Sequence, residues 1–253
     1  AWLSLRQIIK YSSNIGAVKV SEKIGPEILY HTLKNFGFGE KSGIDCPGET
    51  PGSLANYRRW AKIDAASISF GQGVSVSALQ LITAASAIAN YGVLMKPYIV
   101  QAVADQNGRL VQCFGPKQVR RVVSAKTAGA VIKMMKSVVS EDGTGAKAAL
   151  EGYSICGKTG TAQKIDEKGT YADEKYIASF IGFAPAEKPQ VSVLVVIDEP
   201  RKNHYGGTVA SMAFRKIIRE TLDYTNILPE KETNKMMARF PVTTTADNES
   251  HRF

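Results

Sequence analysis

The sequence has few residues of the kinds that cross-link a fold or bind metals. Only three cysteines and three histidines occur among its 253 residues. The cysteines are odd in number and have no paired spacing, which indicates neither a disulfide framework nor a zinc site. The histidines lie far apart, without the spacing of metal ligands. We therefore expect no metal and no cofactor; these residues are Cys46, Cys113, Cys156, His31, His204 and His251.

Long apolar stretches are also missing. No run of about 18 apolar residues occurs, so no membrane span is expected within the sequence. No signal peptide is visible, and the sequence opens with Ala1-Trp2-Leu3 rather than with an initiator methionine, which is typical of a fragment. With 44% hydrophobic and 22% charged residues, the composition is that of a globular protein.

Acidic residues are fewer than basic ones, and the formal net charge of +9 favours an anionic partner. The densest basic patch, residues 57–62, combines cations with aromatic rings, as a nucleic-acid-binding surface can. The remaining positive charge is dispersed, and no nucleic-acid-binding signature accompanies it. We therefore interpret the patch as a solvated face and expect no nucleic-acid partner; an anionic polymer or membrane surface would be attracted by the same charge.

The first half of the sequence is predicted to be mainly helical. Apolar spacing predicts helices over residues 1–11, 15–23 and 26–35, followed by a loop over 38–56 that is rich in glycine, proline and serine. Residues 77–91 are apolar on nearly every side, which predicts a buried helix at the centre of an all-α half.

The junction between the first two helices has two interpretations. Ser13 and Asn14 are of the types that cap a helix N-terminus, and that explanation is adequate by itself. Alternatively, Ser12 and Asn14 form a polar pair that the junction presents to a substrate.

The second half is predicted to form strands. Residues 98–104 and 110–114 flank Asn107-Gly108, which is typical of a β-hairpin, and a helix is expected from Ser124 to about residue 139. Short connections, one of them around Gly169, favour antiparallel pairing of the later strands. We expect a closing helix on one face of this sheet and an α+β fold. The later segments are strands over 153–164, 176–183 and 191–197, a helix over 208–222, and a polar, mobile tail over 229–253.

Residues 157–161, with the sequence Gly-Lys-Thr-Gly-Thr, admit two chemistries. Together with Gly152 they satisfy the phosphate-binding pattern G-x-x-x-x-G-K-[ST]. That pattern requires a strand before the loop and a helix after it. Residues 153–156 are strand formers, and Gly160-Thr161 is a poor start for a helix, so the sequence disfavours a nucleotide site.

The alternative is an edge strand that lines an acyl-transfer cleft. Alternation along a strand points Lys158 and Gly160 to one face and Thr159 and Thr161 to the other. A glycine inside a strand marks a place where a ligand or another backbone comes close. Such a strand offers a substrate amides, hydroxyls and a fixed positive charge.

Further segments occur with this one in an ordered series. Together they resemble the C-terminal part of the transpeptidase domain of class B penicillin-binding proteins of the cell-division type, over about residues 4–223. Lys-Thr-Gly is one of the three short motifs of penicillin-recognising serine enzymes. Residues 42–49 are also similar, apart from Cys46. The six segments are Ser12-Ser13-Asn14, 71–81, Gly143-Thr144-Gly145, 158–163, 178–185 and 205–208.

The resemblance implies a penicillin-binding/serine β-lactamase-like transpeptidase fold: an antiparallel sheet with covering helices plus an all-α half, incomplete at its N-terminus. Residues 1–228 would be the C-terminal part of that domain. The implied activity is D,D-transpeptidation, in which peptidoglycan stem peptides ending in D-Ala-D-Ala are cross-linked through a serine acyl-enzyme. β-Lactams would trap that acyl-enzyme.

The resemblance also assigns roles to residues. Ser12 would relay a proton, and Asn14 would hold the amide carbonyl of the substrate. Lys158 would set the positive potential of the cleft, while the hydroxyls of Thr159 and Thr161 would bind the terminal carboxylate of the substrate.

Three further roles concern the backbone and the edge of the same strand. The amide of Thr161 would be an oxyanion donor, a group typically worth about 3 to 4 kcal/mol of transition-state stabilisation. Gly160 would leave room for substrate against the strand. Gln163 is counted with the substrate-binding residues.

One motif of the family is missing. Ser-x-x-Lys supplies the nucleophile and its base, and no serine here is followed by lysine at that spacing. We expect the motif upstream, so that these residues alone are inactive. The alternative is a non-catalytic scaffold or binding module of the cell-division machinery, and carboxypeptidase or β-lactamase outcomes stay open. The resemblance further implies other cell-division membrane proteins as partners, and a periplasmic or extracytoplasmic location with an upstream membrane anchor.

Overall fold

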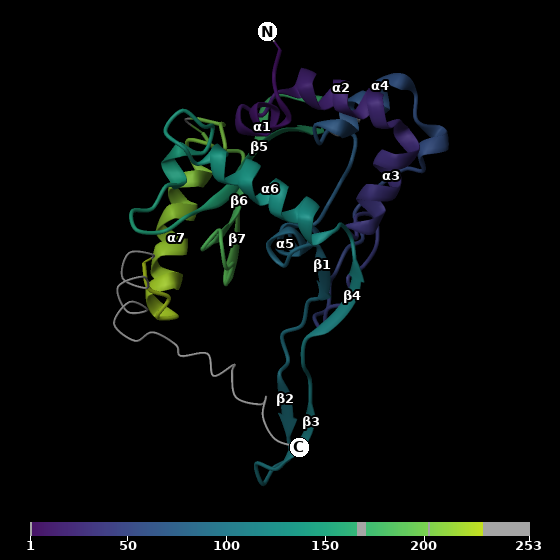
Figure 1. The fold of residues 1–253 in the computed structure, drawn as a ribbon. Coiled ribbons are helices and arrows are strands. Elements are labelled where there is room, and N and C mark those ends of the chain that lie inside the picture. Colours follow the sequence, from purple (N-terminus) through teal and green to yellow (C-terminus); the bar gives the residue numbers. More distant parts are fainter. Residues whose placement is uncertain (1, 166–170, 202, 230–253) are drawn as a thin grey trace, which may run out of the picture.

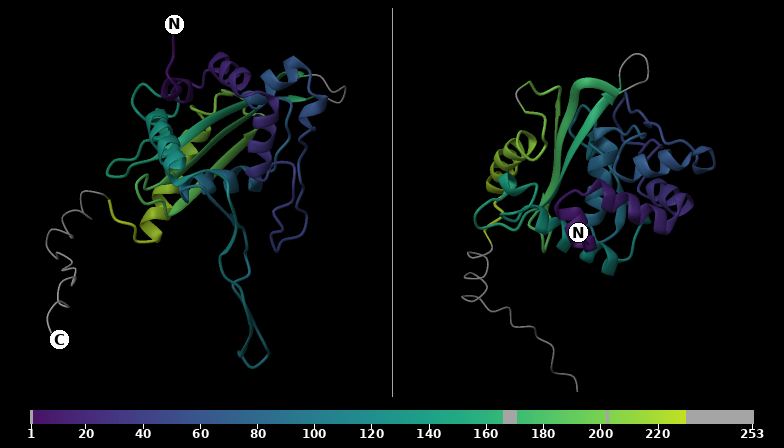
Figure 2. Two further views of the ribbon diagram at one scale, coloured as in Figure 1. Left: turned by 45° about the vertical axis from the view of Figure 1, so that its right-hand side comes forward. Right: turned by 90° about the horizontal axis from the view of Figure 1, so that it is seen from above.

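A three-stranded antiparallel sheet lies between two helical layers (Figure 1). The computed structural model describes residues 2–165, 171–201 and 203–229. Helix α7 covers one face of the sheet, and α5 and α6 cover the other, as Figure 2 shows from above. The α+β prediction and the antiparallel pairing are confirmed, with β5 as the edge strand. These elements are β5 (Cys156–Ile165), β6 (Tyr171–Ala184), β7 (Val191–Asp198), α5 (Ala78–Ala89), α6 (Ala125–Val138) and α7 (Ala210–Tyr224).

The core between the sheet and α7 is built on aromatic rings. Phe180 of β6 and Phe214 of α7 are fully buried, with ring centroids 4.7 Å apart. Ile218 and Leu222 continue the buried stripe of α7 at four-residue spacing, which explains why this helix lies flat on the sheet. Burying each such side chain contributes about 1.5 to 3 kcal/mol. A Cβ at Gly157 would lie 2.3 Å from the Phe180 ring, so only glycine lets β5 approach this core.

Helix α5 lies in a different place from the one expected. It packs against β6, β7, the short strand β1 (Val93–Lys96) and α6 rather than at the centre of an all-α half. Its buried residues include Ala84 and Ala87, whose small side chains let the helix approach the sheet closely. Gln80 is buried at its N-terminal end and donates to the carbonyls of Gly37, Glu40 and Pro51, which fixes the expected 38–56 loop to α5.

Four further helices form the remainder of the helical side. The three expected at the N-terminus are confirmed as α1 (Leu5–Lys10), α2 (Asn14–Ile24) and α3 (Pro26–Asn35). Helix α4 (Lys62–Ser69) was not expected, because Lys62, its first residue, was interpreted as part of the basic patch. Within the described residues, no helix has the length and apolar character needed to cross a membrane.

The predicted hairpin is confirmed as β2 (Ala102–Ala104) and β3 (Leu110–Cys113), and it projects away from the sheet (Figures 1 and 2). Its base is held by strand β4 (Lys117–Arg121), which pairs with β1 and was not expected. The carboxylate of Asp45 also accepts bonds from the amides of Ile99 and Val100 at 2.7 and 2.8 Å. The turn around Gly169 and the tail beyond Pro229 lie outside the described residues.

Candidate active site

Ser12 is the middle residue of the three-residue connection between α1 and α2. The Ser12 amide donates to the Ile9 carbonyl, and the Ser13 amide donates to the Ile8 carbonyl, which closes α1 in a Schellman motif. Ser12 takes the left-handed position of that motif, with φ of +52°, where glycine is usual. A side chain costs about 1 kcal/mol there. Strained backbone of this kind clusters at functional sites, which makes Ser12 a candidate site residue.

The structure assigns the capping role at this junction to Ser13. Ser13 is the N-cap of α2, since its hydroxyl accepts from the Gly16 amide at 3.1 Å. Asn14 is the first residue of α2 and is exposed. The cap therefore accounts for Ser13 alone, and leaves Ser12 and Asn14 as the polar pair presented by the turn.

Lys158 reaches Ser12 from the edge strand of the sheet. Its Nζ donates to the Ser12 hydroxyl at 2.6 Å and to the Thr159 carbonyl at 2.9 Å. The side chain is half-buried, and burial lowers the pKa of Lys158 to about 8. No ion pair joins Lys158 to an acidic residue of the described chain. The contact brings together residues 146 positions apart and sets a desolvated cation beside a strained serine.

The two threonines of β5 face the loop that precedes α7, on the side of the strand opposite Lys158. Thr161 Oγ1 accepts from the amide of Gly206 at 3.2 Å. A Cβ on Gly207 would lie 3.3 Å from the methyl group of Thr159. The alternation predicted for this strand is thus observed.

Hydrogen-bond direction distinguishes the two hydroxyls. Thr144 Oγ1 must donate its single hydrogen to the Lys10 carbonyl, 3.1 Å away, because a carbonyl can only accept. The 3.2 Å bond between Thr159 and Thr144 therefore uses the Thr159 hydrogen. Thr161 accepts from a backbone amide, so its own hydrogen can be donated to a ligand at this exposed position. The resemblance assigns one role to both threonines, whereas their hydroxyls have different hydrogen-bond partners in the structure.

Gly160 lies beside Ser179 of the neighbouring strand β6. A Cβ at this position would lie 2.4 Å from the Ser179 hydroxyl on β6. A Cβ at Gly206 would lie 2.4 Å from the Gly160 carbonyl. The Ser179 side chain therefore borders Gly160 on the Lys158 face of β5, and Gly206 of the loop that precedes α7 approaches the Gly160 carbonyl from the opposite face.

Gln163 follows Thr161 by two positions on β5, so by alternation it shares the face of the two threonines, opposite Lys158. It is paired with Tyr176 on β6, five positions along β5 from Lys158. At about 3.4 Å per residue, that separation is roughly 17 Å. The structure thus brings together Ser12, Lys158 and the two threonines, with Asn14 in the adjoining turn, and Gln163 continues the threonine face of β5 away from Lys158.

The sequence did not single out the contacts of residues 140–145. Asp142 forms an ion pair with Lys10 at 2.5 Å, and Thr144 bonds to the same residue's carbonyl. Gly143-Thr144-Gly145 is one of the six segments on which the resemblance rests, but no local sequence pattern predicted which residues it contacts. Asp142 is separated from Lys10 by 132 positions, so composition and spacing could not reveal the pair.

The phosphate-loop alternative is excluded by the local structure. Strand β5 continues through Thr159 to Ile165, so no helix follows the glycine-lysine-threonine run. The backbone before the strand includes an isolated bridge between Leu150 and Tyr153 rather than an open loop. The run is extended backbone paired with β6, and an extended strand cannot wrap its amides around a phosphate.

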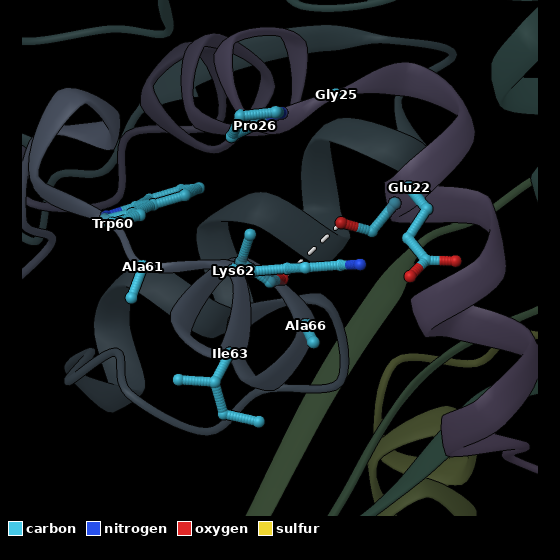
Figure 3. A pocket seen from close by; sticks show the side chains of 10 residues that line it. Glu22, Gly25, Pro26, Trp60, Ala61, Lys62, Ile63 and Ala66 are labelled. Atoms are coloured by element: carbon cyan, nitrogen blue, oxygen red, sulfur yellow. Dashed lines mark hydrogen bonds between the residues drawn. The ribbon is translucent and has the colours of Figure 1, made fainter.

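A cavity of about 910 Å³ lies apart from the polar cluster, between α2 and α4 (Figure 3). The indole of Trp60 and the ring of Pro26 border it, and Lys62 and Glu22 extend along it. Neither Ser12 nor Lys158 lines this cavity, so it is separate from the polar cluster.

Comparison with known proteins agrees with this geometry. The family described as "Penicillin binding protein transpeptidase domain" matches residues 1–219. Stage V sporulation protein D of Bacillus subtilis is 40% identical over 227 residues, which cover 89% of this chain and 35% of the relative. The probable peptidoglycan D,D-transpeptidase PenA of Neisseria meningitidis is 40% identical over 241 residues, covering 94% of this chain and 39% of the relative. The chain thus spans less than half the length of these relatives.

Solved structures show the same fold. The apo transpeptidase domain of penicillin-binding protein 3 from Burkholderia pseudomallei matches with a TM-score of 0.80 at 37% identity, covering 90% of this chain and 66% of that one. Penicillin-binding protein 3 from Mycobacterium tuberculosis, complexed with aztreonam, matches with a TM-score of 0.82 at 34% identity, covering 89% and 52%. The chain belongs to the penicillin-binding protein transpeptidase domain family.

Proposed function

We propose that residues 1–228 are the C-terminal part of a penicillin-sensitive peptidoglycan D,D-transpeptidase. The observation that carries the proposal is the 2.6 Å bond between Lys158 Nζ and the Ser12 hydroxyl, which joins the helical side to the edge of the sheet. A desolvated cation beside a hydroxyl is what acyl transfer to and from a serine needs for proton movement.

Substrate recognition follows from charge and donor direction. A stem peptide ends in a carboxylate, and Lys158 gives the cleft a positive charge, since a pKa of about 8 leaves it mainly protonated at pH 7. Thr161 can donate its hydrogen to that carboxylate while it accepts from Gly206. Asn14, exposed in the turn, would hold the amide carbonyl of the peptide, and β5 would offer its free edge to the backbone of the stem.

The reaction assigns the chain's residues to binding and proton transfer. A serine of a Ser-x-x-Lys motif, outside these 253 residues, attacks the carbonyl carbon of the penultimate D-Ala. The bond to the terminal D-Ala nitrogen breaks, and the proton of the serine passes through Ser12 and Lys158 to the leaving amine. The amine of a second stem peptide then attacks the ester, and the serine is regenerated. The Thr161 amide would stabilise the oxyanion in both steps.

The names of the relatives support the proposed transpeptidase activity. PenA is named a probable peptidoglycan D,D-transpeptidase, and the Mycobacterium tuberculosis protein was solved with aztreonam and with ampicillin bound. We extend the activity and the β-lactam binding to the whole protein of which this chain forms part. We also propose an extracytoplasmic location and cell-division membrane proteins as partners.

Labelling with a fluorescent penicillin and mass mapping of the labelled peptide tests the proposal. The chain of 253 residues and a version extended upstream to include Ser-x-x-Lys would be compared. We expect no label on the chain alone and one labelled upstream serine in the extended protein. A labelled serine within residues 1–253 would contradict the missing nucleophile. An extended protein that is folded and stays unlabelled would favour the scaffold alternative.

A further inference from the structure

Residues 140–145, named here the clamp loop, join the two halves of the candidate site. The loop follows α6 and lies between the end of α1, which precedes the Ser12 turn, and β5, which carries Lys158. Asp142 and Thr144 both contact Lys10, the last residue of α1. Thr144 also receives the hydrogen of Thr159.

The clamp loop is held tightly on both sides. The Gly145 amide donates to the Val138 carbonyl at 2.9 Å, and a Cβ on Gly143 would lie 2.1 Å from that same carbonyl. From the other side, a Cβ on Gly207 would lie 2.1 Å from the Thr144 carbonyl. The loop therefore has little freedom to move, and its side chains are presented in fixed positions.

Two independent contacts tie this fixed loop to α1. The Asp142 carboxylate pairs with the Lys10 ammonium and accepts from the Ser140 hydroxyl, and these bonds lower the pKa of Asp142. The Lys10 carbonyl accepts from both the amide and the hydroxyl of Thr144, at 3.4 and 3.1 Å. Because Lys10 lies two residues before Ser12, these bonds fix the base of the strained turn.

We propose that Thr144 and Asp142 are positioning residues that set the contact between Ser12 and Lys158. Thr144 links the end of α1 to Thr159 by a directed series of bonds, from the Thr159 hydroxyl to Thr144 and from Thr144 to the Lys10 carbonyl. The same series commits the Thr159 hydrogen and leaves Thr161 as the donor toward a carboxylate. The expected effect on acylation rests on the proposed function, whereas the expected effect on the pKa of Lys158 does not.

The structural consequence is measured in the chain itself through Lys158, whose pKa burial lowers to about 8. Titration of the Lys158 side chain by NMR would be compared in Thr144→Val and Thr144→Ser. Valine removes both hydroxyl bonds, so the turn loosens, water reaches Lys158, and its pKa rises by about 1 or more toward 10.5. Serine keeps the hydroxyl and should leave the pKa near 8. A folded valine variant with an unchanged Lys158 pKa would overturn the proposal.

Asp142→Asn gives a second test, because the direction of the change in the Lys158 pKa distinguishes a positioning role from a purely electrostatic one. Loss of a nearby anion would by itself lower the pKa of a lysine, whereas loss of the clamp raises it. The matched control is Glu141→Gln, which removes the neighbouring exposed acid and should change nothing. A fall or no change in the Lys158 pKa of a folded Asp142→Asn variant would contradict the proposal, even if the valine variant fails to fold.

The catalytic consequence is measured in the protein extended to contain the nucleophile. We expect the rate constant for acylation by a fluorescent penicillin to fall about 10- to 100-fold in Thr144→Val, as displacement of a positioned group commonly costs, and to recover in Thr144→Ser. An unlabelled wild-type protein would refute the proposed function and leave the pKa result standing. A labelled wild type with an equally labelled valine variant would refute the positioning role.

Discussion

Lys158 should lower the stability of the fold at neutral pH, and its replacement by methionine should raise it. The pKa of the lysine falls from 10.5 to about 8 on burial. At about 1.36 kcal/mol per pKa unit, the difference of about 2.5 units corresponds to roughly 3 kcal/mol against the charged form. Lys158→Met has a similar shape and no charge, so we expect the free energy of unfolding at pH 7 to increase by up to about 3 kcal/mol.

The dependence of this effect on pH gives the sharper test. Between pH 8 and 10.5 the unfolded chain holds the proton of Lys158 and the folded chain has lost it, so the stability of the wild type rises with pH through this window. Below pH 8 both states are protonated and the full penalty remains. The advantage of Lys158→Met over wild type should therefore shrink by about 3 kcal/mol from pH 7 to pH 10.5. Titrations of other groups are common to both proteins and cancel.

Denaturant unfolding followed by circular dichroism, at pH 7 and pH 10.5, measures both quantities. An advantage of Lys158→Met that is the same at both pH values would refute the claim that Lys158 is desolvated. A variant less stable than wild type at pH 7 would show that the bonds to Ser12 and to the Thr159 carbonyl outweigh the cost of burial.

Two further predictions concern backbone positions of the site. Gly206→Ala should destabilise the fold by about 1 to 3 kcal/mol, since its Cβ would lie 2.2 Å from the Ser179 carbonyl. Gly129→Ala is the matched control: nothing lies within 4 Å of its Cβ, and we expect a gain of up to about 1 kcal/mol in α6; thermal unfolding that ranks the two variants in the opposite order would contradict this. Ser12→Gly should be more stable than Ser12→Ala by about 1 kcal/mol, because both lose the hydroxyl and only glycine relieves the left-handed backbone. Equal unfolding midpoints would show that the turn stores no strain.

The sequence predicted the elements whose local signal is strong. The strand-forming residues 153–156 and the glycine at position 160 indicated an edge strand at Lys158, and that strand is β5. Asn107-Gly108 located the hairpin turn between β2 and β3. Strands β1 and β4 were missed because they are short, and β4 carries three cations among five residues.

The arrangement of the candidate site was harder to predict from sequence. A left-handed residue after a helix is usually glycine, so the Schellman motif gave no signal at Ser12. Asp142 contacts Lys10, and Lys158 contacts Ser12, although each pair is separated by more than 130 positions in the chain. Periodicity and motif spacing carry no information about contacts over such a separation. The resemblance named the segments that meet, but the direction of the bond from Thr159 to Thr144 follows only from the structure.

The central claim is that Lys158 and the Ser12 turn form the proton-transfer side of a D,D-transpeptidase. Its most direct test is release of D-Ala and formation of cross-linked dimer from a stem pentapeptide, by the protein extended to contain Ser-x-x-Lys. We expect the wild type to release D-Ala with matching dimer formation, and folded Lys158→Met to lose at least 100-fold in rate, as removal of a general acid–base group does. A folded wild type that releases no D-Ala, or a methionine variant as fast as wild type, would contradict the claim.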